Sequence, residues 1–482
     1  MSVSHFIHPA SIAIVVVCLA AISPHAQAES GMGAACCQTI ASEPGSRPHK
    51  DREHLLLRAA ADRAAADSNF DEADALYREI LRLDPFNAEA FAALEAVSAA
   101  RPLSRDSWAY QQARAALPNG GARFVEHETR RFIVISDAGA AWTQNQAEHL
   151  ERAWHQFHRF AKRLNLQPLP LRHKLVCILF DRREDYQRFA AEQDGVADLW
   201  IAGYYSPRFD RIVFYNVESD PAMTRARSKL DSMQEQVAKL ARDARRAANE
   251  GNRTQADWLR QNLARYEQHL HREMNRVDNH ARTVSIATTV HEAIHQIAFH
   301  TRVQSPHIQY PLWISEGLAT AFETDSPNHA FGPDHDFAPR REMFLKLLSE
   351  DAVIPLRDLI AMTNLAGATD ETVTAMYHQG YALVSWMSRF RRVPLQNYLS
   401  SMLLEPAGNV SQERHVELFQ AAFGDIAQLE RAWLRHELAS LPDPATARHA
   451  RRMIAIDDVP LPWTPAEPTH AGIIHLLASH GD

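Results

Sequence analysis

Between residues 130 and 217, short apolar runs of strand type alternate with segments in which apolar residues recur every three or four positions. The strand-like runs lie at 130–136, 174–180 and 201–217. The last run contains turn residues near its middle, Ser206, Pro207 and Asp210, and therefore predicts a β-hairpin. The helical patterns occupy 142–163 and 183–193. Together these segments predict an α+β fold, mostly helical, with a small mixed sheet.

A long helical pattern at residues 219–283 predicts an inserted helical hairpin. Asp220 and Pro221 supply an N-cap and a first-turn proline, and apolar residues then repeat with spacings of three and four. Gly251 and Asn252 break the pattern before a second helical stretch returns. The two apolar stripes are typical of an antiparallel coiled coil that projects from its domain. The alternative is a plain pair of helices packed within the core.

The N-terminal region changes from a polar linker at residues 29–50 to an Ala- and Leu-rich helical segment at residues 51–100. Residues 69–97, NFDEADALYREILRLDPFNAEAFAALEAV, resemble one tetratricopeptide unit followed by a further helix. A solenoid needs about three such units for stability. We therefore expect a tetratricopeptide-like helical pair, which either packs on the main domain or serves as a docking module for a protein partner.

The first 28 residues have the pattern of a secretory signal peptide. An apolar run from Ser11 to Ile22 is followed by Ala26-Gln27-Ala28, a typical cleavage site. This pattern predicts a secreted or periplasmic protein with no membrane span in the mature chain, whereas an uncleaved anchor is the alternative. At the other end, residues 441–482 form a tail with few structural signals.

Composition and charge narrow the classes of partner. The 482-residue chain has 46% hydrophobic and 23% charged residues, as ordinary globular proteins do. Its formal net charge of -8 argues against a nucleic-acid-binding protein. Cysteines are too few for a disulfide framework, because only the adjacent Cys36 and Cys37 and a lone Cys177 remain after the signal.

The candidate chemistry begins at His291-Glu292-Ala293-Ile294-His295, which lies in a segment without proline or glycine. On a helix, residues four apart share one face, so both imidazoles can bind one zinc ion. Glu292 lies between them and is suited to take a proton from a metal-bound water molecule. The sequence therefore predicts a metal-binding helix that also carries a general base.

A second segment, PLWISEGLATAFE at residues 311–323, supplies a carboxylate on another helix. Glu316 completes the three protein ligands that a catalytic zinc ion needs, which leaves its fourth position to water. One and two turns further on, Thr320 and Glu323 lie on the same face. Either side chain can orient a ligand imidazole from outside the metal site.

These two segments, HEAIH and WISEGLATAFE, resemble the gluzincin metallopeptidases. The resemblance implies a zincin-like catalytic domain at residues 122–440, with one zinc ion per chain held by His291, His295 and Glu316. It also implies that Glu292 is the general base. A further match, Met376-Tyr377-His378-Gln379-Gly380, resembles the segment whose tyrosine stabilises the oxyanion in those enzymes, and this makes Tyr377 a catalytic candidate. The arrangement is also similar to an uncharacterised bacterial family of secreted gluzincin-like proteins.

The expected activity is hydrolysis of peptide or protein substrates. The chain lacks the Gly-Ala-Met-Glu-Asn segment with which the aminopeptidase group captures a free amine. The strand RIVFYNV is expected to be an exposed edge that pairs with an extended substrate, which favours an endopeptidase. The alternative is a catalytically inactive interaction protein that binds a protein partner through residues 51–100 or 219–283.

Overall fold

The computed structural model describes residues 47–84, 86–101, 103–196 and 202–439. The signal-peptide and tail predictions, for residues 1–28 and 441–482, lie outside these ranges. The predicted linker, residues 29–50, also lies outside them except for residues 47–50, which are helical. The structure is mostly helical, at 67%, and contains one small mixed sheet. The expected α+β class is therefore confirmed at this level.

The sheet has five strands in the order β1-β2-β3-β5-β4. The strands are β1 (Val125–Glu128), β2 (Phe132–Ser136), β3 (Leu175–Phe180), β4 (Gly203–Ser206) and β5 (Arg211–Tyr215). The three central strands, β2, β3 and β5, run parallel, while β1 and β4 are antiparallel to their neighbours. Every residue of the central strands is buried, which is why their sequences are continuous apolar runs and do not alternate.

The expectation that RIVFYNV forms the sheet edge is wrong. Its strand, β5, lies between β3 and β4, and the hairpin partner β4 takes the edge position. The reason is the crossover that joins β3 to the hairpin. It places β5 parallel to β3, and the short turn around Asp210 then leaves β4 on the outer side.

Two layers of helices cover the sheet. On one face, α5 (Ala140–Arg163) and the last part of α8 share a core with the side chains of Val134, Cys177 and Phe214. On the other face, α4 (Trp108–Ala116) and α6 (Arg183–Phe189) pack on Ile133, Ile178 and neighbouring residues. Short helical turns join these elements: Pro118–Gly121, Ala190–Asp194 and Val217–Ser219. The sheet is thus a buried central layer, and the last part of α8 packs on one of its faces.

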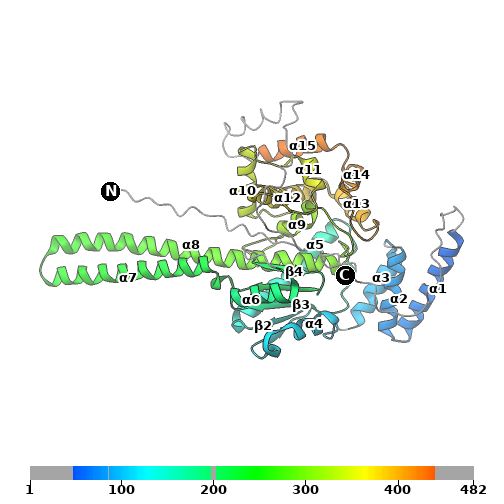
Figure 1. Ribbon diagram of the computed structural model, residues 1–482, viewed down its shortest axis with the longest axis horizontal. Coiled ribbons are helices and arrows are strands. Elements are labelled where there is room, and N and C mark those ends of the chain that lie inside the picture. Colours follow the sequence, from blue (N-terminus) through cyan, green and yellow to red (C-terminus); the bar gives the residue numbers. More distant parts are fainter. Residues whose placement is uncertain (1–46, 85, 102, 197–201, 440–482) are drawn as a thin grey trace, which may run out of the picture.

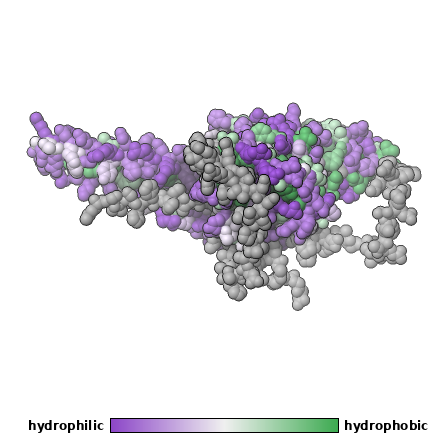
Figure 2. Space-filling model, turned by 90° about the horizontal axis from the view of Figure 1, so that it is seen from above, coloured by the Kyte–Doolittle hydropathy of each residue, from purple (hydrophilic) through white to green (hydrophobic). Residues whose placement is uncertain are grey.

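A long helical hairpin, which we call the arm, projects from this domain (Figure 1). It consists of α7 (Pro221–Asn249) and the first part of α8 (Arg253–His300). Only narrow stripes are buried between the two helices, including Leu230, Ala244 and Leu259, and hydrophilic residues dominate its visible surface (Figure 2). The returning helix does not end near residue 283, because α8 continues without a break into the segment that carries His291 and His295. The arm and the candidate metal centre therefore share one rigid element.

Seven helices after α8 complete the main core. They are α9 (Leu312–Ala321), α10 (Ala338–Ser349), α11 (Leu356–Ala361), α12 (Asp370–Phe390), α13 (Arg392–Met402), α14 (Gln412–Phe423) and α15 (Ile426–Leu438). Their buried side chains belong to the same core as α5 and the metal-bearing part of α8. Within the described ranges, no helix is both long and apolar enough to cross a membrane.

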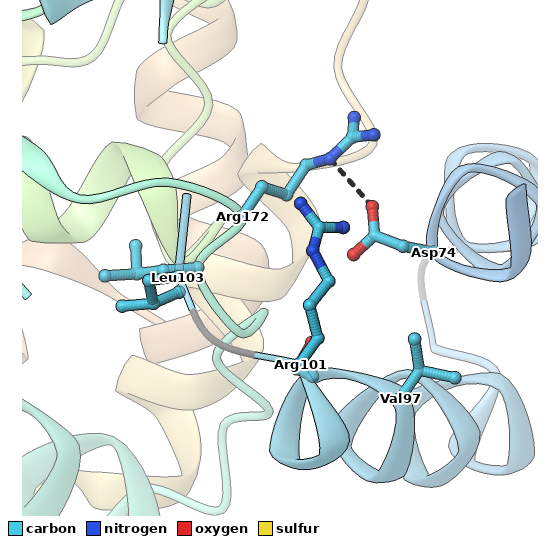
Figure 3. Close-up of a pocket in the computed structure, with 7 residues that line it drawn as sticks. Asp74, Val97, Arg101, Leu103 and Arg172 are labelled. Atoms are coloured by element: carbon cyan, nitrogen blue, oxygen red, sulfur yellow. Dashed lines mark ion pairs between the residues drawn. The ribbon is translucent and has the colours of Figure 1, made fainter. Parts of the chain in front are cut away.

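The N-terminal segment forms three helices, where a pair was expected, and their small core also includes Leu169 of the main domain. They are α1 (Arg47–Ala66), α2 (Phe70–Leu83) and α3 (Ala88–Ala100). Asp74 of α2, only 2% exposed, accepts a hydrogen bond from Arg78 at 2.9 Å and pairs with Arg172 of the main domain at 2.7 Å (Figure 3). The cavity beside this pair holds about 10 Å³, which is space for a single water molecule. This junction is therefore a packed interface.

Candidate metal centre

The two histidines of the HEAIH segment lie one turn apart on α8 and point to the same side. Their Nε2 atoms are 3.1 Å apart, and both side chains are fully buried. The helix is buried almost all around between Val284 and Ala298, because it lies between the sheet on one side and the C-terminal helices on the other. The apolar residues that flank the motif in sequence therefore hold both imidazoles at one fixed place.

The third ligand candidate, Glu316, comes from α9. Its carboxylate oxygens lie 3.3 Å from His291 Nε2 and 3.6 Å from His295 Nε2. The next residue, Gly317, allows α12 to come close, since a Cβ atom there would lie 2.8 Å from the carbonyl oxygen of Gly380. This glycine contact sets the position of α9 and hence of the carboxylate.

The donor atoms of this group fit a metal ion. One donor atom from each of His291, His295 and Glu316 lies within 4.8 Å of the others, and the group is buried. Ligand atoms that share a tetrahedral ion at about 2.1 Å lie about 3.4 Å apart, close to the separations given above. The buried oxygens of Glu316 also have no hydrogen-bond partner among the described residues. Buried polar atoms normally have a partner, and a bound metal ion would supply one here. The group can therefore hold a metal ion.

A buried chain of polar groups supports His291 from behind. Its Nδ1 atom lies 2.9 Å from Oε1 of Glu323, and Arg340 donates to both oxygens of that carboxylate at 2.7 Å. Of the two candidates for orienting the imidazole, Glu323 is therefore the one in contact. The Thr320 hydroxyl instead donates to carbonyl oxygens of its own helix. Sequence reasoning missed Arg340, since it lies on α10, 17 residues beyond Glu323.

The electrostatics of the group favour positive charge at its centre. Burial opposes protonation of His291, but Glu316 and Glu323 outweigh burial and raise its pKa to about 10. Burial also disfavours the charged form of Glu316, which by itself would raise its pKa. The two neighbouring imidazoles outweigh burial and lower this pKa to about 2. These opposite shifts have a common cause, because each buried imidazole–carboxylate contact favours the charged form of both partners.

Glu292 lies next to the ligand group but is not part of it. The side chain is fully buried, and burial raises the pKa of its carboxyl to about 8, although His291 acts in the opposite direction. The backbone of Tyr205 on the edge strand β4 also faces this carboxylate and offsets part of the rise. A carboxyl group in these surroundings can both hold and release a proton near neutral pH.

Tyr377, the other catalytic candidate, is buried on α12 beside Arg340. The guanidinium carbon of Arg340 lies 5.8 Å from the centre of the Tyr377 ring. The neighbouring His378 is also nearly buried, and burial lowers its pKa to about 3, so its imidazole is neutral at pH 7. The structure thus brings Tyr377 into the surroundings of the Glu323–Arg340 pair, while its role at an oxyanion stays a prediction.

Comparisons with known proteins connect this centre to one family. A search of curated proteins and a search of solved structures each found no match. Residues 285–403 match a family described as "Protein of unknown function (DUF1570)". The match covers less than half of the chain, but it includes His291, Glu292, His295, Glu316 and Tyr377. The segment 285–403 is therefore similar to this family of unknown function, whereas the arm and the sheet lie outside the match.

Proposed function

We propose that this protein is a zinc-dependent endopeptidase of the gluzincin type. The observation that carries the proposal is the buried convergence of His291, His295 and Glu316 from two helices, with Glu292 beside them on α8. Three protein ligands and one open position are typical of catalytic metal sites, whereas a structural zinc site has four protein ligands. The resemblance of HEAIH and WISEGLATAFE to gluzincins supports the same conclusion.

The donor set favours zinc over other metals. Two imidazoles and one carboxylate suit an ion of intermediate softness, while calcium and magnesium prefer oxygen ligands alone. When bound, Zn²⁺ polarises a carbonyl group and lowers the pKa of its water molecule. The contact between Glu323 and His291 Nδ1 would fix the tautomer and the orientation of that imidazole.

Glu292 is the residue that would move the proton during hydrolysis. It accepts a proton from the attacking water molecule and delivers it to the leaving amine. Burial raises the pKa of this carboxyl, which favours the protonated form that delivers a proton to the leaving amine. The backbone of Tyr205, on the edge strand β4, lies next to the Glu292 carboxylate. An extended substrate can pair with an edge strand of this kind. This arrangement supports cleavage within a polypeptide.

Metal analysis and a peptide screen test the proposal together. We expect about one zinc ion per chain in the purified protein by elemental analysis, as a single complete ligand set predicts. We also expect cleavage of a mixed-sequence peptide library, loss of this activity after chelation, and recovery when zinc is added back. A protein that binds no zinc after reconstitution would overturn the proposal and favour a non-enzymatic interaction protein.

Replacing Arg340 should weaken metal binding without touching a ligand. In Arg340→Ala, Glu323 loses both of its hydrogen bonds from Arg340 and holds His291 less firmly. We expect zinc affinity to fall by about 10- to 100-fold, measured by competition with a chelating dye. Arg340→Lys should recover part of the affinity, because it restores the charge but not the two-point contact.

The neighbouring Arg341 provides a matched control for this experiment. It pairs with the buried Glu437, away from the metal ligands, so Arg341→Ala also removes an arginine–carboxylate contact. Its zinc affinity should stay close to that of the wild type. Equal affinities in Arg340→Ala and Arg341→Ala would show that the Glu323–Arg340 pair does not position His291.

A further inference from the structure

A large cavity lies where the arm joins the main domain. Its volume is about 670 Å³, within the range of about 300–1,000 Å³ that ligand sites occupy. Five segments contribute to its walls: α5, the turn at Val217–Ser219, α7 through Arg227, the middle of α8, and the loop 325–329. That loop begins two residues after Glu323, so the cavity borders the region that supports the metal centre.

The cavity lies on the same face of α8 as Glu292. Asp278 and Ser285 line it, and both are separated from Glu292 by multiples of seven residues. Seven residues are close to two helical turns, so the three side chains leave the helix in nearly the same direction. Ser285 then precedes Glu292 by about 10.5 Å along the helix, which equals about three residues of an extended peptide.

The walls are held in place by contacts within the described residues. Gln146 of α5 donates to Ser285 at 3.1 Å and accepts from Thr289 at 2.7 Å, which ties α5 to α8 at the cavity. Arg227 of the arm pairs with both Glu218 and Asp278 and so joins the arm helices to the turn below them. The cavity is therefore preorganised, and the arm supplies part of it.

The chemistry of the lining suits a polypeptide. Four carboxylates and three guanidinium groups share the surface, so neither a polyanion nor a polycation is favoured as a ligand. Asn145 and Asn328 provide donors and acceptors that a peptide backbone requires. Nδ1 of His149 is also buried with no hydrogen-bond partner among the described residues, and Trp142 adds an aromatic wall.

We propose that this cavity is a substrate-binding subsite that receives the part of a polypeptide lying about three or more residues from the scissile bond. The proposal rests on the proposed peptidase function and names the substrate class of that same site. It also assigns a role to the arm, whose base forms one wall. Long peptides reach the subsite, whereas peptides that end close to the scissile bond do not.

Binding of peptides of two lengths tests the subsite without requiring cleavage. The protein carries Glu292→Gln, so that bound peptides stay intact, and fluorescence anisotropy follows labelled mixed-sequence peptides of about four and about twelve residues. We expect the longer peptides to bind about tenfold more tightly or better. Asn145→Trp, which places a bulky side chain at an exposed lining position, should remove this advantage. Asn275→Trp, at an exposed arm position outside the cavity, should preserve it.

Two results would overturn the subsite. One is equal binding of long and short peptides, and the other is an unchanged advantage of long peptides in Asn145→Trp. The proposed hydrolysis is judged separately, by zinc content and peptide cleavage with Glu292 intact. A length advantage that depends on the cavity, in a protein that binds no zinc and cleaves nothing, would support the subsite while rejecting the peptidase.

Discussion

Replacing Glu292 by glutamine is expected to lower peptide hydrolysis by about 10²- to 10⁴-fold while zinc remains bound. The amide has nearly the same shape as the carboxylate but cannot accept a proton from the attacking water molecule. Glu292 is also not among the three ligand candidates, so the metal site should stay complete. Zinc content and kcat/KM, measured on the same preparation, check both halves of this expectation.

A control for this substitution is Glu342→Gln, at an exposed position on α10. It removes the same charge from a side chain outside the ligand group and should leave both zinc content and activity unchanged. If the Glu292→Gln protein binds zinc and cleaves peptides as well as the wild type, Glu292 is not the general base and the proposed mechanism fails. If the variant loses zinc as well, Glu292 contributes to the metal site itself.

Replacing His295 by alanine should remove the zinc ion. Complete zinc sites with four protein ligands bind with about 10–16 kcal/mol at pH 7, so one ligand contributes about 3–4 kcal/mol. That loss corresponds to a fall in affinity of about 10²- to 10³-fold. The deleted imidazole lies beside Oε1 of Glu316 and Nε2 of His291, so its removal takes one of the three ligand atoms out of the buried group. Elemental analysis after dialysis checks this expectation.

His300 offers a matched control on the same helix. Its Nε2 atom lies 2.7 Å from Asp210 at the hairpin turn, so His300→Ala removes an imidazole that has a structural partner outside the metal centre. This variant should retain about one zinc ion per chain. Full zinc content in His295→Ala, with the variant folded, would contradict the ligand set and with it the proposed function.

The sequence by itself determined the local elements and the chemistry of the candidate site. Continuous apolar runs predicted β2 and β3. A strand that is buried on both faces has apolar side chains on both, so its sequence does not alternate between apolar and polar residues. The spacing of four between His291 and His295 placed both imidazoles on one helix face. Glu316 could be named because its neighbourhood, WISEGLATAFE, resembles a known ligand segment. These are properties of short segments, so they are readable without the fold.

Only the tertiary structure decided how those segments meet. Strand order depends on the direction of a crossover. Here the crossover places β5, the strand within RIVFYNV, inside the sheet and leaves β4 at its edge. The choice between Thr320 and Glu323 depends on where the chain after α9 places Glu323. The presence of Arg340 depends on the position of α10, which brings its guanidinium group to that carboxylate. The cavity at the base of the arm likewise combines five segments. Contacts between residues far apart in sequence leave no periodic signal, because each depends on the positions of whole elements and not on the spacing within one.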